Sequence, residues 1–298
     1  MIFPPPLPSA PRLLAVAPSS PFDPELLKQG LARLTQAWFR VESSHFSTPQ
    51  GFLAGSDDER CAQLQQALDD PELDVVLVAR GGYGLARIVP RLDFERFRKK
   101  PKWLVGFSDT TVLHAQLWNH GIASLHAGNA TTLGSAQPAD FEAVACALRH
   151  QEAPTFSLQG LRPGRGRGRL VGGNLTVLFA EAAAGRLFIP EGSVLFLEDV
   201  SETSYRIDRM LVALRAGGHL SRCSALVFGD FTDCSAGRFE VPVVEVIRQF
   251  SAQLDIPCAT GLPVGHGPRN HPLVCGVWAE LNVSPDGDSS LAIERPDL

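Results

Sequence analysis

A serine stands where a strand-like segment turns into a helix-like one. In KPKWLVGFSDTTVLHAQLWNHG, the apolar run Trp103 to Phe107 is followed by Ser108 and then by apolar residues at helical spacing. A strand, a sharp turn with serine and a helix make the layout of a nucleophile elbow, which exposes the hydroxyl and directs a helix N-terminus at developing negative charge. The sequence around Ser108 differs from the usual G-x-S-x-G motif, because Asp109 and Thr110 follow the serine in place of a small residue and glycine. The structural alternative is a serine that caps the helix.

A glycine-rich loop, ARGGYGLAR, directly follows another apolar run at 73–79. Gly81, Gly82 and Gly84 would let backbone N–H groups approach an anion closely, either as an oxyanion hole or as a phosphate cradle. The loop matches neither G-x-G-x-x-G nor the P-loop pattern, and a plain tight turn is the alternative. Loops at the carboxyl ends of neighbouring parallel strands converge in one crevice, which favours a shared site with Ser108.

A catalytic serine needs a base, and the base needs an orienting acid. SVLFLEDV ends an apolar strand with Glu198 and Asp199, and Glu198 is the predicted acid. In GLPVGHGPRNHPL, His266 and His271 share one loop, and either fits the role of base. Nothing resembles the His and carboxylate spacing of a catalytic metal site, so we expect no metal and no cofactor.

The elements that must position these residues alternate between strands and helices. This alternation predicts an α/β fold with a mainly parallel sheet in the N-terminal half. The expected strands are 13–17, 73–79 and 103–107, and the expected helices include 24–38 and 57–68.

The amino-acid composition changes after residue 150, where the segment TFSLQGLRPGRGRGRLVGG is rich in glycine and arginine. We interpret it as a linker, with Arg162, Arg165, Arg167 and Arg169 on a solvated segment. Further elements are expected at 193–200, 207–215, 224–231, 243–253 and 277–283. The predicted domains are a nucleophile domain at 1–150, a linker at 151–170 and a smaller α/β domain at 171–298.

Composition narrows the class of partner. The 298 residues are 44% hydrophobic and 20% charged, with a formal net charge of −5. A slight, evenly spread charge gives no case for nucleic-acid or membrane binding, so a small-molecule partner is favoured. The N-terminus lacks a signal-peptide pattern, and the six cysteines lack C-x-x-C spacing. These features predict a cytoplasmic protein with reduced thiols.

Six short sequence motifs, in this order along the chain, resemble those of a known family: VAPSSP, ARGGYG, GFSDTTVLH, VGGNLTVL, LFLEDVSETSYRIDRML and GLPVGHGPRN. Together they are similar to the L,D-carboxypeptidases of serine-peptidase family S66, over essentially the whole chain. The family includes muramoyltetrapeptide carboxypeptidases and microcin C immunity peptidases. The resemblance implies an N-terminal fold like flavodoxin or the class I glutamine amidotransferases. One departure is LHAGNA, where relatives often read His-Gly-Pro, and it leaves the role of His126 open.

Carried over by motif, the resemblance implies a triad of Ser108, Glu198 and His266, with the acid and base in the C-terminal domain. It further implies an oxyanion hole formed by the backbone N–H groups of Asp109 and of Gly81 or Gly82, with Gly82 preferred. The substrate-binding residues expected on the same ground are Gly81, Tyr83, Asn174, Tyr205 and Arg206.

The implied activity is removal of the terminal D-alanine from murein tetrapeptides during peptidoglycan recycling, by a cytoplasmic homodimer. A microcin-type immunity peptidase that cleaves aminoacyl-adenylate analogues is the alternative, although only a short segment separates GGNL from Glu198, whereas members of that type tend to carry a longer loop. From another class, the chain would be a catalytically silent murein-peptide binder or a glycine-loop nucleotide binder.

Overall fold

The computed structural model describes residues 1–149, 153–285 and 288–295, which divide into two compact units. Among these residues, the first unit holds everything up to 149 together with His271–Val274, and the second holds the remainder. The fold is mixed α/β in two parts, as predicted. None of the helices in the described ranges combines the length and apolar character that crossing a membrane requires.

The first unit is built on a six-stranded sheet in the order β2-β1-β3-β4-β5-β11. The pairs β1–β2, β1–β3, β3–β4 and β4–β5 are parallel. Its strands are β1 (Arg12–Val16), β2 (Arg40–Ser43), β3 (Val75–Val78), β4 (Trp103–Gly106), β5 (Ser124–His126) and β11 (Leu273–Cys275). The expected likeness to flavodoxin or the glutamine amidotransferases stays a prediction.

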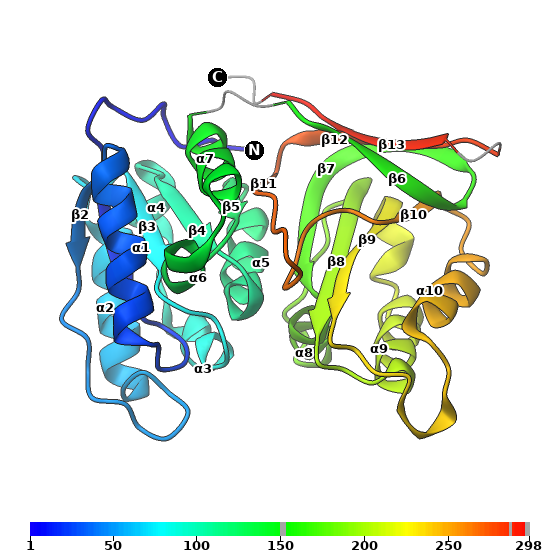
Figure 1. Ribbon diagram of the computed structural model, residues 1–298, viewed down its shortest axis with the longest axis horizontal. Helices are drawn as coiled ribbons and strands as arrows, with labels where there is room; N and C mark the ends of the chain where they lie inside the picture. Colours follow the sequence, from blue (N-terminus) through cyan, green and yellow to red (C-terminus); the bar gives the residue numbers. More distant parts are fainter. Residues whose placement is uncertain (150–152, 286–287, 296–298) are drawn as a thin grey trace. The chain divides into compact units, whose positions relative to one another are not determined.

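Helices cover this sheet, and α1, α6 and α7 lie together on one face (Figure 1). That face buries alternate residues of the central strands, among them Val75, Leu77 and Val105, against Leu27 of α1 and Ala130 of α6. The helices of the unit are α1 (Pro24–Ala37), α2 (Asp57–Asp69), α3 (Leu85–Ile88), α4 (Glu95–Lys99), α5 (Thr111–Asn119), α6 (Ala130–Ser135) and α7 (Pro138–Leu148), with 3₁₀ turns η1 (Val89–Arg91) and η2 (Ser108–Thr110). Completely buried strands explain the nearly continuous apolar runs in the sequence.

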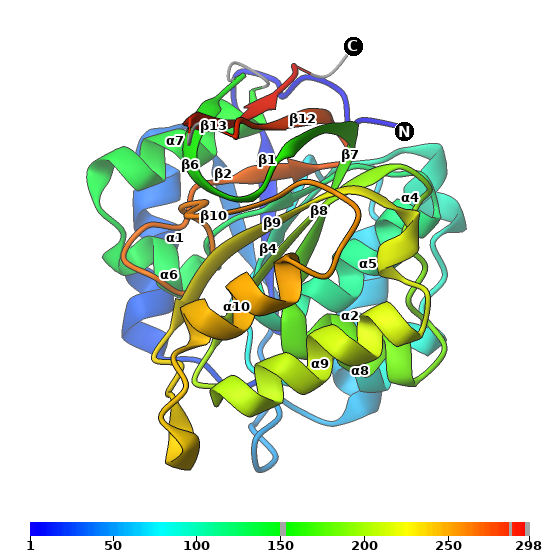
Figure 2. The same ribbon diagram turned by 90° about the vertical axis from the view of Figure 1, so that its right-hand side faces the viewer.

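The second unit is a closed seven-stranded barrel in the order β10-β6-β13-β12-β7-β8-β9. Helices α8, α9 and α10 lie against one side of it (Figure 2). Its strands are β6 (Thr155–Arg162), β7 (Gly164–Asn174), β8 (Ser193–Val200), β9 (Cys223–Thr232), β10 (Cys258–Thr260), β12 (Trp278–Val283) and β13 (Asp288–Ile293). Its helices are α8 (Leu175–Ala183), α9 (Ser204–Ala216) and α10 (Val243–Ser251), with η3 (Leu220–Arg222) and η4 (Gly237–Phe239).

The predicted linker is wrong, because most of 151–170 belongs to β6 and β7 of the barrel; residues 151 and 152 lie outside the described residues. In β7 the arginines and glycines alternate with the period of a strand. The glycine side is crowded, since a Cβ at Gly168 would lie 1.7 Å from the Gly192 carbonyl oxygen. On the arginine side, Arg165 pairs with Glu280 at 2.8 Å and Arg167 lies over the Trp278 ring. The Gly-Arg alternation is therefore a strand pattern.

Candidate active site

Ser108 occupies a strained corner between a buried strand and a helix. β4 ends at Gly106, Ser108 has φ +64°, and η2 leads into α5. A left-handed backbone is uncommon outside glycine and is typical of the tight turn that presents a nucleophile. Thr110, and not Ser108, occupies the N-cap position of α5. The strand, turn and helix layout is confirmed, and the helix-cap interpretation of Ser108 is wrong.

The glycine loop lies directly against Ser108. A Cβ at Gly81 would lie 2.8 Å from the Ser108 Cβ and 3.0 Å from its Oγ, so only glycine allows this approach. The loop is also bonded to the segment after β1. Ser20 N–H donates to the Gly81 carbonyl at 3.3 Å, and the Ser20 Oγ accepts from Tyr83 N–H at 3.1 Å. Backbone groups of the loop are thereby held beside the Ser108 side chain.

The residue after the serine is bound to the far end of the same loop. The Asp109 carboxylate is buried and its Oδ2 accepts from the Leu85 N–H, at the first residue of α3, at 3.0 Å. This bond satisfies a helix N-terminal donor. Asp109 therefore couples the serine turn to the glycine loop through its side chain.

A buried histidine supports the strand that carries the serine. His114 lies 2.9 Å through Nε2 from the Gly106 carbonyl oxygen and 2.8 Å through Nδ1 from the Ser124 Oγ. Because a carbonyl only accepts, Nε2 carries the proton and Nδ1 accepts from the serine hydroxyl. Burial lowers the pKa of His114 to about 4, against the opposing effect of the Gly106 bond. His114 is therefore neutral and structural. His126 is also buried, with its ring 5.9 Å from that of His114.

In the second unit, Glu198 and His266 form a close acid–imidazole pair. Glu198 is completely buried on β8, and its Oε2 lies 2.7 Å from the His266 Nδ1. Burial works to lower the pKa of His266, but the hydrogen bond and charge of Glu198, with a contribution from Asp199, raise it overall. The carboxylate thus stabilises the imidazolium and fixes the proton of the neutral ring on Nδ1.

The loop that carries His266 has little room for side chains. Gly265 has φ +131°, and a Cβ there would lie 2.8 Å from the Glu198 Oε2. The Gly265 N–H donates to the Asn270 Oδ1 at 3.2 Å, which closes the loop behind the histidine. His271, the other candidate base, belongs to the first unit, where burial lowers its pKa and Asp140 works against that change.

Asp199 faces a different set of groups from its neighbour. Its Oδ2 accepts from the Thr176 N–H at 3.0 Å and hydroxyl at 2.8 Å, and its Oδ1 accepts from the Asn174 amide at 3.0 Å. The Asn174 Oδ1 in turn accepts from the Val177 N–H at 3.1 Å and so caps α8. Burial raises the pKa of Asp199, and the bonds it accepts oppose this. Asp199 and Asn174 therefore hold the start of α8.

Three predicted substrate-binding side chains are solvent-accessible. Tyr83 and Tyr205 are about half exposed, and the Arg206 Nε lies 3.0 Å from the Glu202 Oε2. Their contact with substrate, and that of Asn174, stays a prediction. Sequence reasoning assigned no role to Ser20 or Asn270, although both lie inside the quoted blocks VAPSSP and GLPVGHGPRN. For Ser20 the available signal was its place after β1, at the carboxyl edge of a parallel sheet.

Across 1–149, 153–285 and 288–295, no three His, Cys, Asp or Glu side chains come together in a way that could hold a metal ion.

A strained serine against a glycine loop and a buried acid paired with histidine are features of a serine hydrolase. Models of the LD-carboxypeptidase N-terminal and C-terminal domains match residues 14–127 and 167–281. The chain therefore belongs to the LD-carboxypeptidase family, peptidase family S66, and is a serine-type carboxypeptidase.

Named relatives agree with this placement. The chain is 32% identical to the murein tetrapeptide carboxypeptidase of Pseudomonas aeruginosa, over 91% of this chain and 92% of that protein. The crystal structure of muramoyltetrapeptide carboxypeptidase from Oxalobacter formigenes superposes with a TM-score of 0.84 at 28% identity, over 96% and 99% of the two chains. The microcin C7 self-immunity protein MccF of Escherichia coli is 24% identical over 83% of this chain and 81% of that protein.

Proposed function

We propose that this carboxypeptidase removes the terminal D-alanine from murein tetrapeptides, with Ser108 as nucleophile, His266 as base and Glu198 as orienting acid. The observation that carries the proposal is the 2.7 Å bond between the His266 Nδ1 and a completely buried Glu198. With the proton on Nδ1, the lone pair of the ring lies on Nε2, where a general base for a serine hydroxyl needs it.

The chemistry proceeds through an acyl-enzyme. His266 accepts the Ser108 proton as the Oγ attacks the carbonyl of the peptide bond before D-alanine. The N–H groups of Gly82 and Asp109 bind the oxyanion, and His266 then protonates the leaving amine of D-alanine. Water hydrolyses the acyl-enzyme by the same steps in reverse order, and no cofactor is needed.

The substrate assignment draws on the printed names of the relatives and on the family. A murein tetrapeptide ends in D-alanine linked to the L-centre of a dibasic residue, and this is the bond we propose is cut. Peptidoglycan recycling in the cytoplasm by a homodimer completes the proposal. The small net charge of −5 supports a peptide substrate more than a polyanion.

The direct test is incubation with a murein tetrapeptide and detection of released D-alanine. Ser108→Ala is the matched control, because it removes one oxygen at a half-buried position. We expect D-alanine from the wild-type protein only, and labelling of Ser108 by a fluorophosphonate. Cleavage of an aminoacyl-adenylate analogue in place of the tetrapeptide would contradict the substrate assignment. Absence of labelling would contradict the serine mechanism.

A further inference from the structure

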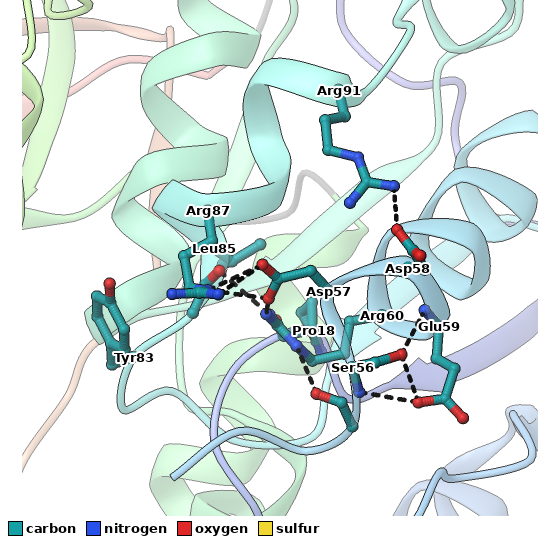
Figure 3. A network of polar contacts seen from close by, with 12 residues as sticks. Pro18, Ser56, Asp57, Asp58, Glu59, Arg60, Tyr83, Leu85, Arg87 and Arg91 are labelled. Atoms are coloured by element: carbon teal, nitrogen blue, oxygen red, sulfur yellow. Dashed lines mark hydrogen bonds and ion pairs between the residues drawn. The ribbon is translucent and has the colours of Figure 1, made fainter. Parts of the chain in front are cut away.

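Arg60, on α2, is a buried cation bonded almost entirely to backbone. Only 1% of the side chain is exposed. Its Nη1 donates to the carbonyl oxygens of Pro18 and, at 3.1 Å, of Gly84, and its Nε donates to that of Gly55 at 3.3 Å. Its Nη2 is bonded to Asp57 (Figure 3). A guanidinium presents several donors in a fixed fork, so one side chain can hold several carbonyls in a set geometry.

Two of these carbonyls belong to two loops that are bonded to each other, and the second of these loops lies against Ser108. Pro18 lies after β1, and Gly84 ends the glycine loop that follows β3. Gly84 has φ +145°, and a Cβ there would lie 2.7 Å from the Arg60 Nη1. Only glycine at this position leaves room for the guanidinium. Arg60 therefore binds the backbone of both loops through one guanidinium group.

The clamped loops hold the backbone beside the nucleophile. Ser20, two residues after Pro18, is bonded to the backbone of Gly81 and Tyr83. Gly81 in turn lies against the Ser108 side chain. A shift at Pro18 or Gly84 is thus passed along hydrogen-bonded backbone to the glycine loop that contains Gly81 and Gly82.

Asp57 connects the buried Arg60 to an exposed arginine, Arg87. Besides Arg60, it accepts hydrogen bonds from the Arg87 Nε at 2.9 and 3.0 Å and from the Arg87 Nη2 at 2.7 Å. The hydrogen bonds and the charge of Asp57 raise the pKa of Arg87. Asp57 therefore links Arg60 to Arg87, which lies on α3 directly after the glycine loop.

We propose that Arg60 is a positioning residue of this carboxypeptidase, which holds the glycine loop so that its N–H groups meet the developing oxyanion. The inference rests on the proposed function, because it assumes that Ser108 attacks and that the loop binds the resulting charge. Arg60 does not touch the substrate; it acts through the carbonyls of Pro18 and Gly84.

The test compares Arg60→Met, Arg60→Lys and Ser20→Ala with Arg91→Met. Arg91 pairs with Asp58 on the exposed side of the same helix, 2.6 Å apart, and has no bond to the loop in the described structure. For each variant, kcat and KM for the tetrapeptide, the rate of fluorophosphonate labelling and the melting temperature are measured. A displacement of about 1 Å at a catalytic group costs about 100-fold, so Arg60→Met should lose about that factor in kcat with little change in KM.

Arg60→Lys should recover part of the lost kcat, because an ammonium can donate to some of the same carbonyls. Ser20→Ala should lower kcat at nearly unchanged melting temperature, since it removes the two hydroxyl bonds to the Tyr83 backbone without leaving a buried charge. Arg91→Met should match the wild type. If Arg60→Met fails to fold, Ser20→Ala decides the question. Wild-type kcat in folded Arg60→Met, or in Ser20→Ala, would overturn the inference. A wild-type protein that neither releases D-alanine nor is labelled would instead overturn the proposed function.

Discussion

The two units prepare their chemical groups by different physical means. In the first, backbone geometry prepares the site: Ser108 at φ +64° and Gly81 packed against its side chain. In the second, side-chain electrostatics prepares it: the buried Glu198 raises the pKa of His266. The arrangement around Ser108 depends on glycine and backbone strain, whereas the pKa of His266 depends on burial and charge. Variants of the two units should therefore fail in distinguishable ways.

The largest effect is expected in the first unit. Ser108→Ala removes the nucleophile, and loss of a triad nucleophile lowers kcat about a million-fold. The measurement is D-alanine release, with circular dichroism to establish that the fold is kept. Near-normal turnover in the folded variant would contradict the serine mechanism.

A loss of similar size is expected from His266→Ala in the second unit, because nucleophile and base act as one. The matched control is His271→Ala, which should keep a measurable rate and a similar pH profile. The two profiles are recorded side by side on folded protein. If His271→Ala is the inactive variant, the base has been misassigned.

Glu198→Gln should cost less, about 10⁴-fold in kcat, since the acid orients the imidazole without bonding to substrate. The same variant also tests whether Glu198 controls the pKa of His266. The active base is neutral, so activity rises as pH passes upward through the His266 pKa, which Glu198 raises. Without the charge of Glu198, burial lowers that pKa against only the smaller contribution of Asp199, so the acid limb of kcat/KM should move to lower pH. An unmoved limb would mean that Glu198 does not control this histidine.

Asp199→Asn should act on stability more than on chemistry. An asparagine replaces one carboxylate oxygen with an amide NH2, so a donor would face either the Thr176 donors or the Asn174 amide, and each buried group left unpaired costs about 1–3 kcal/mol. Urea unfolding should show the loss, while kcat of the folded fraction falls less than in Glu198→Gln. Equal or reversed losses in kcat would move the acid to Asp199.

The smallest effect is expected from a chelator. No set of metal ligands can be read from the sequence, and turnover in EDTA should equal that of the untreated protein. Loss of turnover that added zinc restores would contradict a mechanism built only on side chains and backbone.

The sequence by itself determined the buried strands and the turn from strand to helix at Ser108. The runs that became β1, β3 and β4 are apolar on both faces, and a serine between the apolar run and a helical pattern marks the turn between strand and helix. Ordered motif blocks also identified the family, because several short blocks in the right order are a property of the linear chain.

Tertiary structure alone decided which groups face each other. Successive strand residues point to opposite sides, so Glu198 met His266 while Asp199 met Asn174 and Thr176, and no local pattern separates the two acids. The Gly-Arg run became β7 only because its glycines pack against distant backbone. Arg60 binds the carbonyls of Pro18 and Gly84, which are remote from it in the chain. Contacts between distant residues depend on how the whole chain packs, and a linear pattern does not encode them locally.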